Sequence, residues 1–282
     1  MPDRILVFIP CYNCERQIGR VLEQLRSVPP GLFEEVLVVD NGSRDGTVQA
    51  AAEALPSVSA GRARVVRNDD NYNLGGSHKA AFGYAERSGF THVVVLHGDD
   101  QGSIADLLPL LREGVHRRFD ACLGSRFMRG ARLKGYSRFR TFGNLVFNGL
   151  FTLASRRRVL DLGSGLNVFA RSVFADPMNR KYPDDLRFNV YLLLGLVDRA
   201  RSFAFFPISW REDDQVSNVR IVSQALKTLT IAREYVLQRD FFRSGEHRAV
   251  PRGAYTFQVV AGRGAGLPEA EPGAAAGLEG RP

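Results

Sequence analysis

Residues 93–103, VVVLHGDDQGS, run from a wholly apolar segment into a histidine, a glycine and two adjacent carboxylates. The apolar part is typical of a buried strand. Two neighbouring carboxylates repel each other, so keeping both ionised near low-dielectric protein is costly unless a cation or hydrogen-bond donors compensate them. Either a cation binds there, or Asp99 or Asp100 caps a helix over residues 104–112. The stretch by itself favours neither interpretation.

Four strand-like runs in the first hundred residues alternate with helical patterns. Strands are expected at residues 4–9, 35–39, 63–67 and 92–96, and helices at 15–28, 47–55 and 77–88. This alternation predicts βαβ units and an α/β fold with a mostly parallel central sheet flanked by helices. Ligands of such sheets bind beyond the carboxyl ends of the strands. The loops 10–15, 40–47, 68–77 and 97–103 are therefore predicted to share one site.

The later sequence continues the same domain. A strand is expected at 121–124, then a basic and aromatic stretch over 126–158, a strand at 203–210 and an amphipathic helix at 217–238. From about residue 245 the composition shifts to Gly, Ala, Pro, Glu and Arg, with too few large apolar side chains to pack. We predict a single domain over 1–240, with halves at 1–103 and 104–240, and a disordered tail over 245–282.

Composition limits the functional class. The 282 residues carry a formal net charge of +8, which indicates an anionic partner such as a phosphate, a nucleotide or an anionic membrane. A recognisable nucleic-acid module is missing from the sequence, so nucleic acid is not the expected partner. No apolar run reaches 18 residues and the first residues do not resemble a signal peptide, which predicts a cytoplasmic protein that is either free or peripheral to a membrane. The three cysteines, including the pair Cys11 and Cys14, are interpreted as structural.

The ordered loop motifs carry a family resemblance. VFIPCYNCE, VVDNGSRDGT, NYNLGGSHKAAFGYA and VVVLHGDDQGS resemble the nucleotide-sugar-binding half of family 2 glycosyltransferases with the Rossmann-like GT-A fold. DLGSGLNVFARSV and PISWREDDQVSN look like the acceptor-side motifs of the polyprenyl-phosphate sugar transferase branch, which includes dolichyl-phosphate mannose synthases. The resemblance covers roughly residues 4–220 and implies a metal-dependent transfer of a sugar with inversion.

For the donor, the resemblance implies a site for a UDP- or GDP-linked sugar. Tyr12 can lie against the base, Asp40 is placed to bind the nucleoside, and Lys79 can reach a phosphate. Asn13 and Lys79 also have explanations that need no ligand, because Asn13 can cap the following helix and Lys79 can be a solvated lysine on a helix face. The full set of expected nucleotide-sugar-binding residues is Pro10, Tyr12, Asn13, Glu15, Asp40, Asn41, Gly75, Gly76, Lys79, His97, Asp99, Asp100 and Gln101.

The metal site is expected in LHGDDQ. Laid over the DxD-type motif of the family, this segment puts His97 at the first acid and Asp99 at the second. Asp99 is then the main ligand of Mg²⁺ or Mn²⁺, which bridges it to the diphosphate. His97 departs from the pattern, and since imidazole suits Mn²⁺ better than Mg²⁺, both the metal and the role of His97 stay open.

On the acceptor side, the segment from Asp161 through Gly165 matches the D-x-x-S-G pattern of the family, but Leu166 and Asn167 replace a frequent aromatic–arginine pair. Arg126 is expected to act in catalysis, and Asp184 and Asp185 are candidate bases should the acceptor be a hydroxyl. A lipid phosphate needs no strong base, because its oxygen is already anionic. The expected acceptor-binding residues are Arg126, Arg138, Arg140, Ser164, Asn167, Arg211 and Ser217.

The preferred acceptor is a polyprenyl phosphate, because the basic and apolar stretch 126–158 suits the anionic inner face of the plasma membrane. One alternative is transfer to a saccharide hydroxyl in cell-surface polysaccharide assembly. Another is a nucleotide-sugar-binding protein without catalysis, which the departures at Asn41, His97 and Asn167 suggest.

Overall fold

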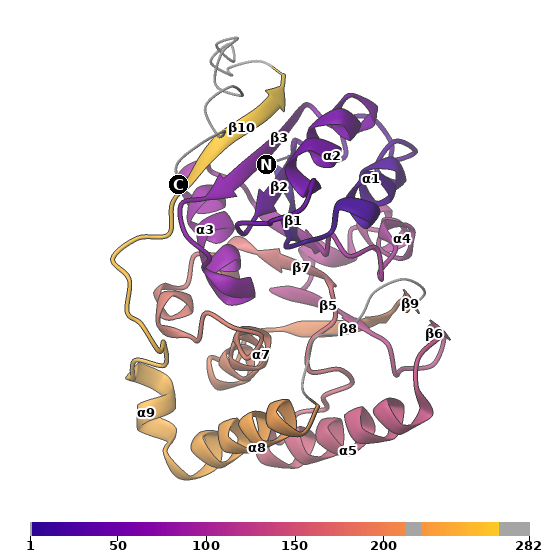
Figure 1. Cartoon of the computed structure of the whole chain (residues 1–282). Coiled ribbons are helices and arrows are strands. Elements are labelled where there is room, and N and C mark those ends of the chain that lie inside the picture. Colours follow the sequence, from indigo (N-terminus) through magenta and orange to yellow (C-terminus); the bar gives the residue numbers. More distant parts are fainter. Residues whose placement is uncertain (1, 213–220, 265–282) are drawn as a thin grey trace.

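The computed structural model describes residues 2–212 and 221–264, and its centre is an eight-stranded mixed sheet (Figure 1). The strand order is β10-β3-β2-β1-β4-β7-β5-β8. The strands are β1 (Ile5–Cys11), β2 (Glu35–Asp40), β3 (Arg62–Asn68), β4 (His92–Leu96), β5 (Ala121–Ser125), β7 (Leu166–Ala170), β8 (Phe203–Pro207) and β10 (Phe257–Arg263). A second sheet pairs β6 (Arg132–Lys134) with β9 (Ser209–Arg211) in parallel.

Helices cover both faces of the large sheet. They are α1 (Glu15–Gln24), α2 (Thr47–Ala54), α3 (Asn73–Arg87), α4 (Leu108–Arg112), α5 (Arg138–Ser155), α6 (Arg171–Phe174), α7 (Phe188–Asp198), α8 (Ile221–Leu237) and α9 (Arg239–Ser244). Alternate residues of β1 enter two cores, one shared with α1, α2 and α4 and the other shared with α3, α6 and α7. Continuous valine and leucine runs are required in such strands because both faces are buried.

The α/β fold expected from the sequence is confirmed. Strands β3, β2, β1 and β4 pair in parallel, and β4 has the bounds expected from its valine run. Strand β7 lies between β4 and β5 and is antiparallel to both, and the sequence analysis did not identify it. The segment 203–210 was expected as one strand but forms β8 and β9, which belong to different sheets. The expected helix 104–112 is a 3₁₀ turn (Ile104–Asp106) followed by α4.

The predicted disordered tail is wrong for residues 245–264. Strand β10 pairs antiparallel with the edge strand β3, from Phe257 opposite Asn68 to Arg263 opposite Ala63. Main-chain hydrogen bonds to an exposed strand edge order a segment that has few apolar side chains of its own. Residues 265–282 lie outside the described residues, as does Ser217. Within the described ranges, we find no helix that combines the length and the apolar character needed to span a membrane.

Candidate active site

The loops after β1, β2 and β4 meet at the carboxyl edge of the sheet. The Gly98 N–H donates to the Pro10 carbonyl at 3.1 Å, which joins the loop after β4 to the end of β1. The Asn13 N–H donates to Ser43 Oγ at 2.9 Å, and the Arg44 N–H donates to Asn13 Oδ1 at 2.9 Å. The structure therefore brings these loops to one place, as the strand-end rule predicts.

The first loop leaves Tyr12 available. Tyr12 is 49% exposed and lies beside Asn13, which has a left-handed backbone with φ of 51°. Asn13 does not cap α1, since the N-terminus of that helix has no side-chain cap and Asn13 Oδ1 is used by Arg44. Glu15 Oε2 accepts from the Gly46 N–H at 3.1 Å. Asn13 and Glu15 thus fix the first two loops together, and Tyr12 offers a free aromatic face.

The second loop holds its polar residues internally. Asp40 is fully buried, accepts from the Ser43 N–H at 3.1 Å and lies 3.3 Å from Arg67 Nε. Asn41 Oδ1 accepts from Asn68 Nδ2 at 3.0 Å and from the Tyr72 N–H at 2.8 Å. Asn41 therefore ties β2 to β3 and the loop that follows it. The nucleoside contacts expected of Asp40 and Asn41 stay predictions.

The two carboxylates of the opening stretch have different surroundings. Neither caps the following turn, because Ser103 Oγ accepts from the Ala105 N–H, and within the described part of the chain Asp99 Oδ1 accepts only from the nearby Gln101 N–H, at 3.2 Å. Asp100 is 2% exposed and is held by Arg20, Gln24 and Arg211. Burial raises the pKa of Asp99 to about 6, with a smaller contribution from the charge of Asp100. Among the described residues Asp99 has no ion-pair partner, so its carboxylate is suited to bind a cation.

His97 has the features of a neutral ligand. Its backbone N–H donates to the Gly165 carbonyl at 3.0 Å, while its Nε2 is buried and has no hydrogen-bond partner among the described residues. Burial lowers its pKa to about 4, so the ring is neutral at physiological pH and keeps a lone pair. Asp99 and His97 are thus chemically suited to Mn²⁺, although their ligation of a metal stays a prediction.

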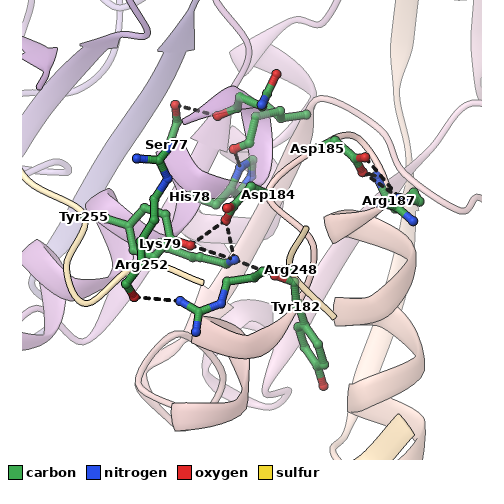
Figure 2. A network of polar contacts seen from close by, with 12 residues as sticks. Ser77, His78, Lys79, Tyr182, Asp184, Asp185, Arg187, Arg248, Arg252 and Tyr255 are labelled. Carbon is green, nitrogen blue, oxygen red and sulfur yellow. Dashed lines mark hydrogen bonds and ion pairs between the residues drawn. The ribbon is translucent and has the colours of Figure 1, made fainter. Parts of the chain in front are cut away.

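Lys79 does not lie on a solvated helix face. Figure 2 shows its side chain directed from α3 to Asp184, with Nζ 2.5 Å from Asp184 Oδ1 and 3.3 Å from the Tyr255 hydroxyl. Desolvation lowers the pKa of Lys79 to about 8. Asp185 accepts from Arg187 Nε at 2.9 Å (Figure 2). Lys79 and both candidate bases are therefore engaged with protein partners.

Gly75 and Gly76 are explained by packing within the fold. A Cβ on Gly75 would lie 2.5 Å from the Pro183 carbonyl oxygen, and one on Gly76 would lie 2.4 Å from the Tyr72 Cβ. Contacts within the protein are therefore enough to exclude a side chain at both positions. Their expected approach to the nucleotide stays a prediction.

Hydrogen bonds within the protein hold the acceptor-side turn. Arg126 forms a bidentate pair with Asp161, with both N–O distances 2.8 Å, and the Arg126 N–H also donates to Asp161. Ser164 and Asn167 are buried, and Asn167 Nδ2 donates to the Ser164 carbonyl at 2.9 Å. A small pocket opens beside this turn. It is lined in part by Asp161, Ser164, Asn167, Asn189 and leucines of α7.

The other arginines expected on the acceptor side have different surroundings from one another. Arg138 is exposed at the start of α5, and Arg140 pairs with Glu212 at 2.6 Å. Arg211 contacts Asp100, and its expected role in acceptor binding stays a prediction. Arg20 and Gln24, which bond to Asp100, were not predicted as site residues, although their spacing of four residues puts both on one face of α1.

Another group of side chains with metal-ligand character lies at the opposite edge of the sheet. Asp3, His92 and His116 each offer a ligand atom, and these atoms lie within 4.8 Å of one another. Asp3 Oδ2 is 2.8 Å from His116 Nε2 and accepts from Arg117 Nε at 2.9 Å. These contacts account for the cluster without an ion, and its position at the amino ends of β1 and β4 separates it from the loops described above.

Similarity to solved structures supports the fold. Glucosyl-3-phosphoglycerate synthase from Mycobacterium tuberculosis in complex with phosphoglyceric acid aligns with a TM-score of 0.60 at 17% identity, over 83% of this chain and 80% of that chain. The same synthase in complex with Mn²⁺, UDP-glucose and glycerol 3-phosphate aligns with a TM-score of 0.58 at 17% identity, over 82% and 80% of the two chains. The expected GT-A-like fold is confirmed.

Sequence comparisons identify the family. Polyprenol monophosphomannose synthase of Mycolicibacterium smegmatis is 26% identical over 61% of this chain and 63% of its own length. Dolichyl-phosphate hexose transferase of Haloferax volcanii is 26% identical over 74% of this chain and 84% of its own length. The family model described as Glycosyl transferase family 2 matches residues 6–177. The chain belongs to glycosyl transferase family 2.

Proposed function

We propose that this chain is a metal-dependent glycosyltransferase that moves a sugar from a nucleoside-diphosphate sugar to a polyprenyl phosphate. The main support is Asp99, a carboxylate without an ion-pair partner in the described part of the chain, located where three strand-end loops meet. Tyr12 supplies an exposed aromatic ring beside this place for the base. A nucleotide, its diphosphate and a cation each find a suitable group there.

The reaction depends mainly on positioning and on charge. Asp99 and His97 would hold Mg²⁺ or Mn²⁺, which stabilises the negative charge of a diphosphate leaving group. The acceptor phosphate oxygen is already anionic and attacks the anomeric carbon of the sugar, with inversion as the family resemblance implies. No residue has to remove a proton in this scheme. It agrees with the pairing of Asp184 with Lys79 and of Asp185 with Arg187, which leaves neither carboxylate idle as a base.

An exposed apolar surface supports the lipid acceptor. Helices α5 and α8 lie side by side at the end of the molecule opposite β10 (Figure 1). On α5, Phe139, Phe142 and Leu153 are 75%, 67% and 79% exposed, and on α8 Leu226 is 61% exposed. Soluble monomers rarely expose so many large apolar side chains together. Arginines in the first turn of α5 and the absence of acidic residues from that helix suit an anionic membrane surface.

The relatives support the same choice. Two curated relatives are named for transfer to polyprenol or dolichyl phosphate carriers. Peripheral binding to the inner face of the plasma membrane would bring the lipid phosphate to the acceptor side of the domain.

The donor and the acceptor are tested in sequence. A thermal-shift screen of UDP- and GDP-linked sugars with Mg²⁺ or Mn²⁺ identifies the donor, because ligand binding to the native state raises the unfolding temperature. The labelled donor is then incubated with membrane extract, and an organic-extractable labelled lipid is the expected product. A water-soluble labelled saccharide instead would favour the hydroxyl acceptor. Nucleotide binding with neither transfer nor hydrolysis would favour a binding protein without catalysis.

The membrane surface has its own test. The double variant Phe139→Ser/Phe142→Ser is expected to lose sedimentation with phosphatidylglycerol-containing vesicles while it keeps nucleotide binding. Val260→Ser on β10 is the control, since Val260 is 45% exposed at the opposite end of the molecule. Equal sedimentation of both variants would contradict the role of α5.

A further inference from the structure

Asp100 is held by side chains from two other elements of the fold. Its Oδ2 accepts from Arg20 Nε at 2.7 Å and contacts Arg211 Nη2, while its Oδ1 accepts from Gln24 Nε2 at 2.9 Å. The side chain is 1% exposed, and the two arginines come from different elements, α1 and β9. One carboxylate thus neutralises part of the charge of two guanidinium groups.

Arg211 is also fixed to the backbone of the same loop. Its N–H donates to the Gln101 carbonyl at 3.0 Å, and its Nε donates to the Asp100 carbonyl at 2.8 Å. These bonds hold Arg211 against the loop that contains Asp99. Asp100 itself adopts a left-handed backbone with φ of 59°, a conformation that Asp and Asn tolerate better than most residues.

Asp99 and Asp100 are adjacent but differ in their contacts with arginines. Asp99 has a hydrogen bond from its own loop and, among the described residues, no ion pair, although two arginines contact the adjacent carboxylate. An arginine beside a metal-binding carboxylate competes with the metal, because it satisfies the same oxygen atoms and adds a positive charge.

We propose that Asp100 is a positioning residue that retains Arg211 and thereby keeps Asp99 free for the divalent cation. This inference rests on the proposed function, because it takes Asp99 as the metal ligand. Asp100 need not touch the metal or the sugar. Its role is to occupy the guanidinium of Arg211, which would otherwise pair with Asp99.

The proposal predicts a rescue that a purely structural role does not. In Asp100→Asn the backbone conformation is preserved but the charge is lost, so Arg211 is released toward Asp99. Affinity for Mn²⁺ in the presence of UDP should fall by about tenfold, the low end of the effect of a cation beside a carboxylate. In Asp100→Asn/Arg211→Gln the competing cation is gone, and the affinity should return to within about threefold of the wild-type value.

The measurement is Mn²⁺ titration of the full chain with and without UDP, in which electron paramagnetic resonance quantifies free Mn²⁺. Arg26→Gln is the matched control, since it removes one positive charge from the segment just after α1 at a side chain that is 69% exposed. Thermal unfolding of each variant shows that it is folded. If Asp100→Asn does not fold, Asp100→Gly accommodates the same backbone, and it is tested alone and with Arg211→Gln under the same expectations.

The outcomes separate the two proposals. Wild-type chain that binds no Mn²⁺ with UDP or another nucleoside diphosphate overturns the metal assignment of Asp99 and this inference with it. Wild-type chain that binds Mn²⁺, combined with unchanged affinity in the Asp100 variant, overturns the inference alone. A double variant as weak as the single one also overturns it, because the loss would then come from the shape of the loop.

Discussion

Gly98 is predicted to be intolerant of any side chain because of Cys11. A Cβ at position 98 would lie 2.4 Å from Cys11 Sγ, 3.1 Å from the Pro10 carbonyl oxygen and 3.3 Å from Cys14 Sγ. Gly98 is not among the residues with positive φ, so the problem in Gly98→Ala is steric contact and not backbone strain. The glycine is needed where the loop after β4 crosses the end of β1.

The size of the effect follows from the overlap. An ordinary contact of this kind is about 3.4 Å or longer, so the new methyl group would overlap Cys11 Sγ by about 1 Å. Cys11 is 3% exposed in a central strand and has little room to move. Overpacking of a rigid core typically costs about 1–3 kcal/mol, and we expect Gly98→Ala to lower the free energy of unfolding by about 2 kcal/mol.

Removal of the sulfur should relieve the overlap. Cys11→Ala alone should cost about 1 kcal/mol for the small cavity, and Gly98→Ala/Cys11→Ala should be more stable than the sum of the two single effects by at least about 1 kcal/mol. Cys14→Ala is the matched control, because Cys14 Sγ is farther from the new methyl group and should relieve less. The assay is urea unfolding of the four variants and the wild type. Additive effects within about 0.5 kcal/mol would refute the steric explanation.

Three further predictions concern Asp161, His78 and Asp99. Asp161→Asn leaves the guanidinium of Arg126 without its charged partner in a buried setting, and urea unfolding should show a loss of about 3–5 kcal/mol. His78 of α3 is buried against the rings of Phe8, Phe82 and Phe188, and this burial lowers its pKa from 6.5 to about 3. The unfolded chain therefore binds the extra proton first, and stability falls as pH drops below 6.5. His78 alone should cost about 2 kcal/mol between pH 7 and pH 5, and this part of the slope should be absent from His78→Phe. Asp99→Ala should abolish metal-dependent turnover, and normal turnover by a folded variant would contradict the metal assignment.

The sequence located the candidate site through strand ends. A short run of β-branched valines is typical of a buried strand, and loops at the carboxyl ends of parallel strands converge, so His92–Leu96 and the following loop could be placed correctly. Strand β7 was missed because its five residues follow a glycine-rich turn and have no alternating pattern. Strand β10 was missed because it is ordered by the edge of β3 and not by side chains that it buries itself.

The choice of partner for each charged residue could not be predicted. The sequence shows that Arg126 lies in a basic stretch, but Asp161, which it pairs with, is 35 residues away. Lys79 and Asp184 are 105 residues apart and are joined by Tyr255 from the segment that was expected to be disordered. Such pairs depend on tertiary geometry, because any of several arginines and carboxylates satisfies the same electrostatic requirement.

These ion pairs reduce the positive charge that the protein itself offers to a bound diphosphate. Three cations that the sequence assigned to phosphates each contact a carboxylate, namely Arg126 with Asp161, Arg211 with Asp100 and Lys79 with Asp184. A paired cation contributes less net charge toward an incoming anion than a free one, since its partner compensates it. Asp99, by contrast, adds negative charge where the diphosphate would lie. The described residues of the site therefore approach charge balance only with a divalent cation at Asp99, and the nucleotide should bind more tightly with Mn²⁺ than without it.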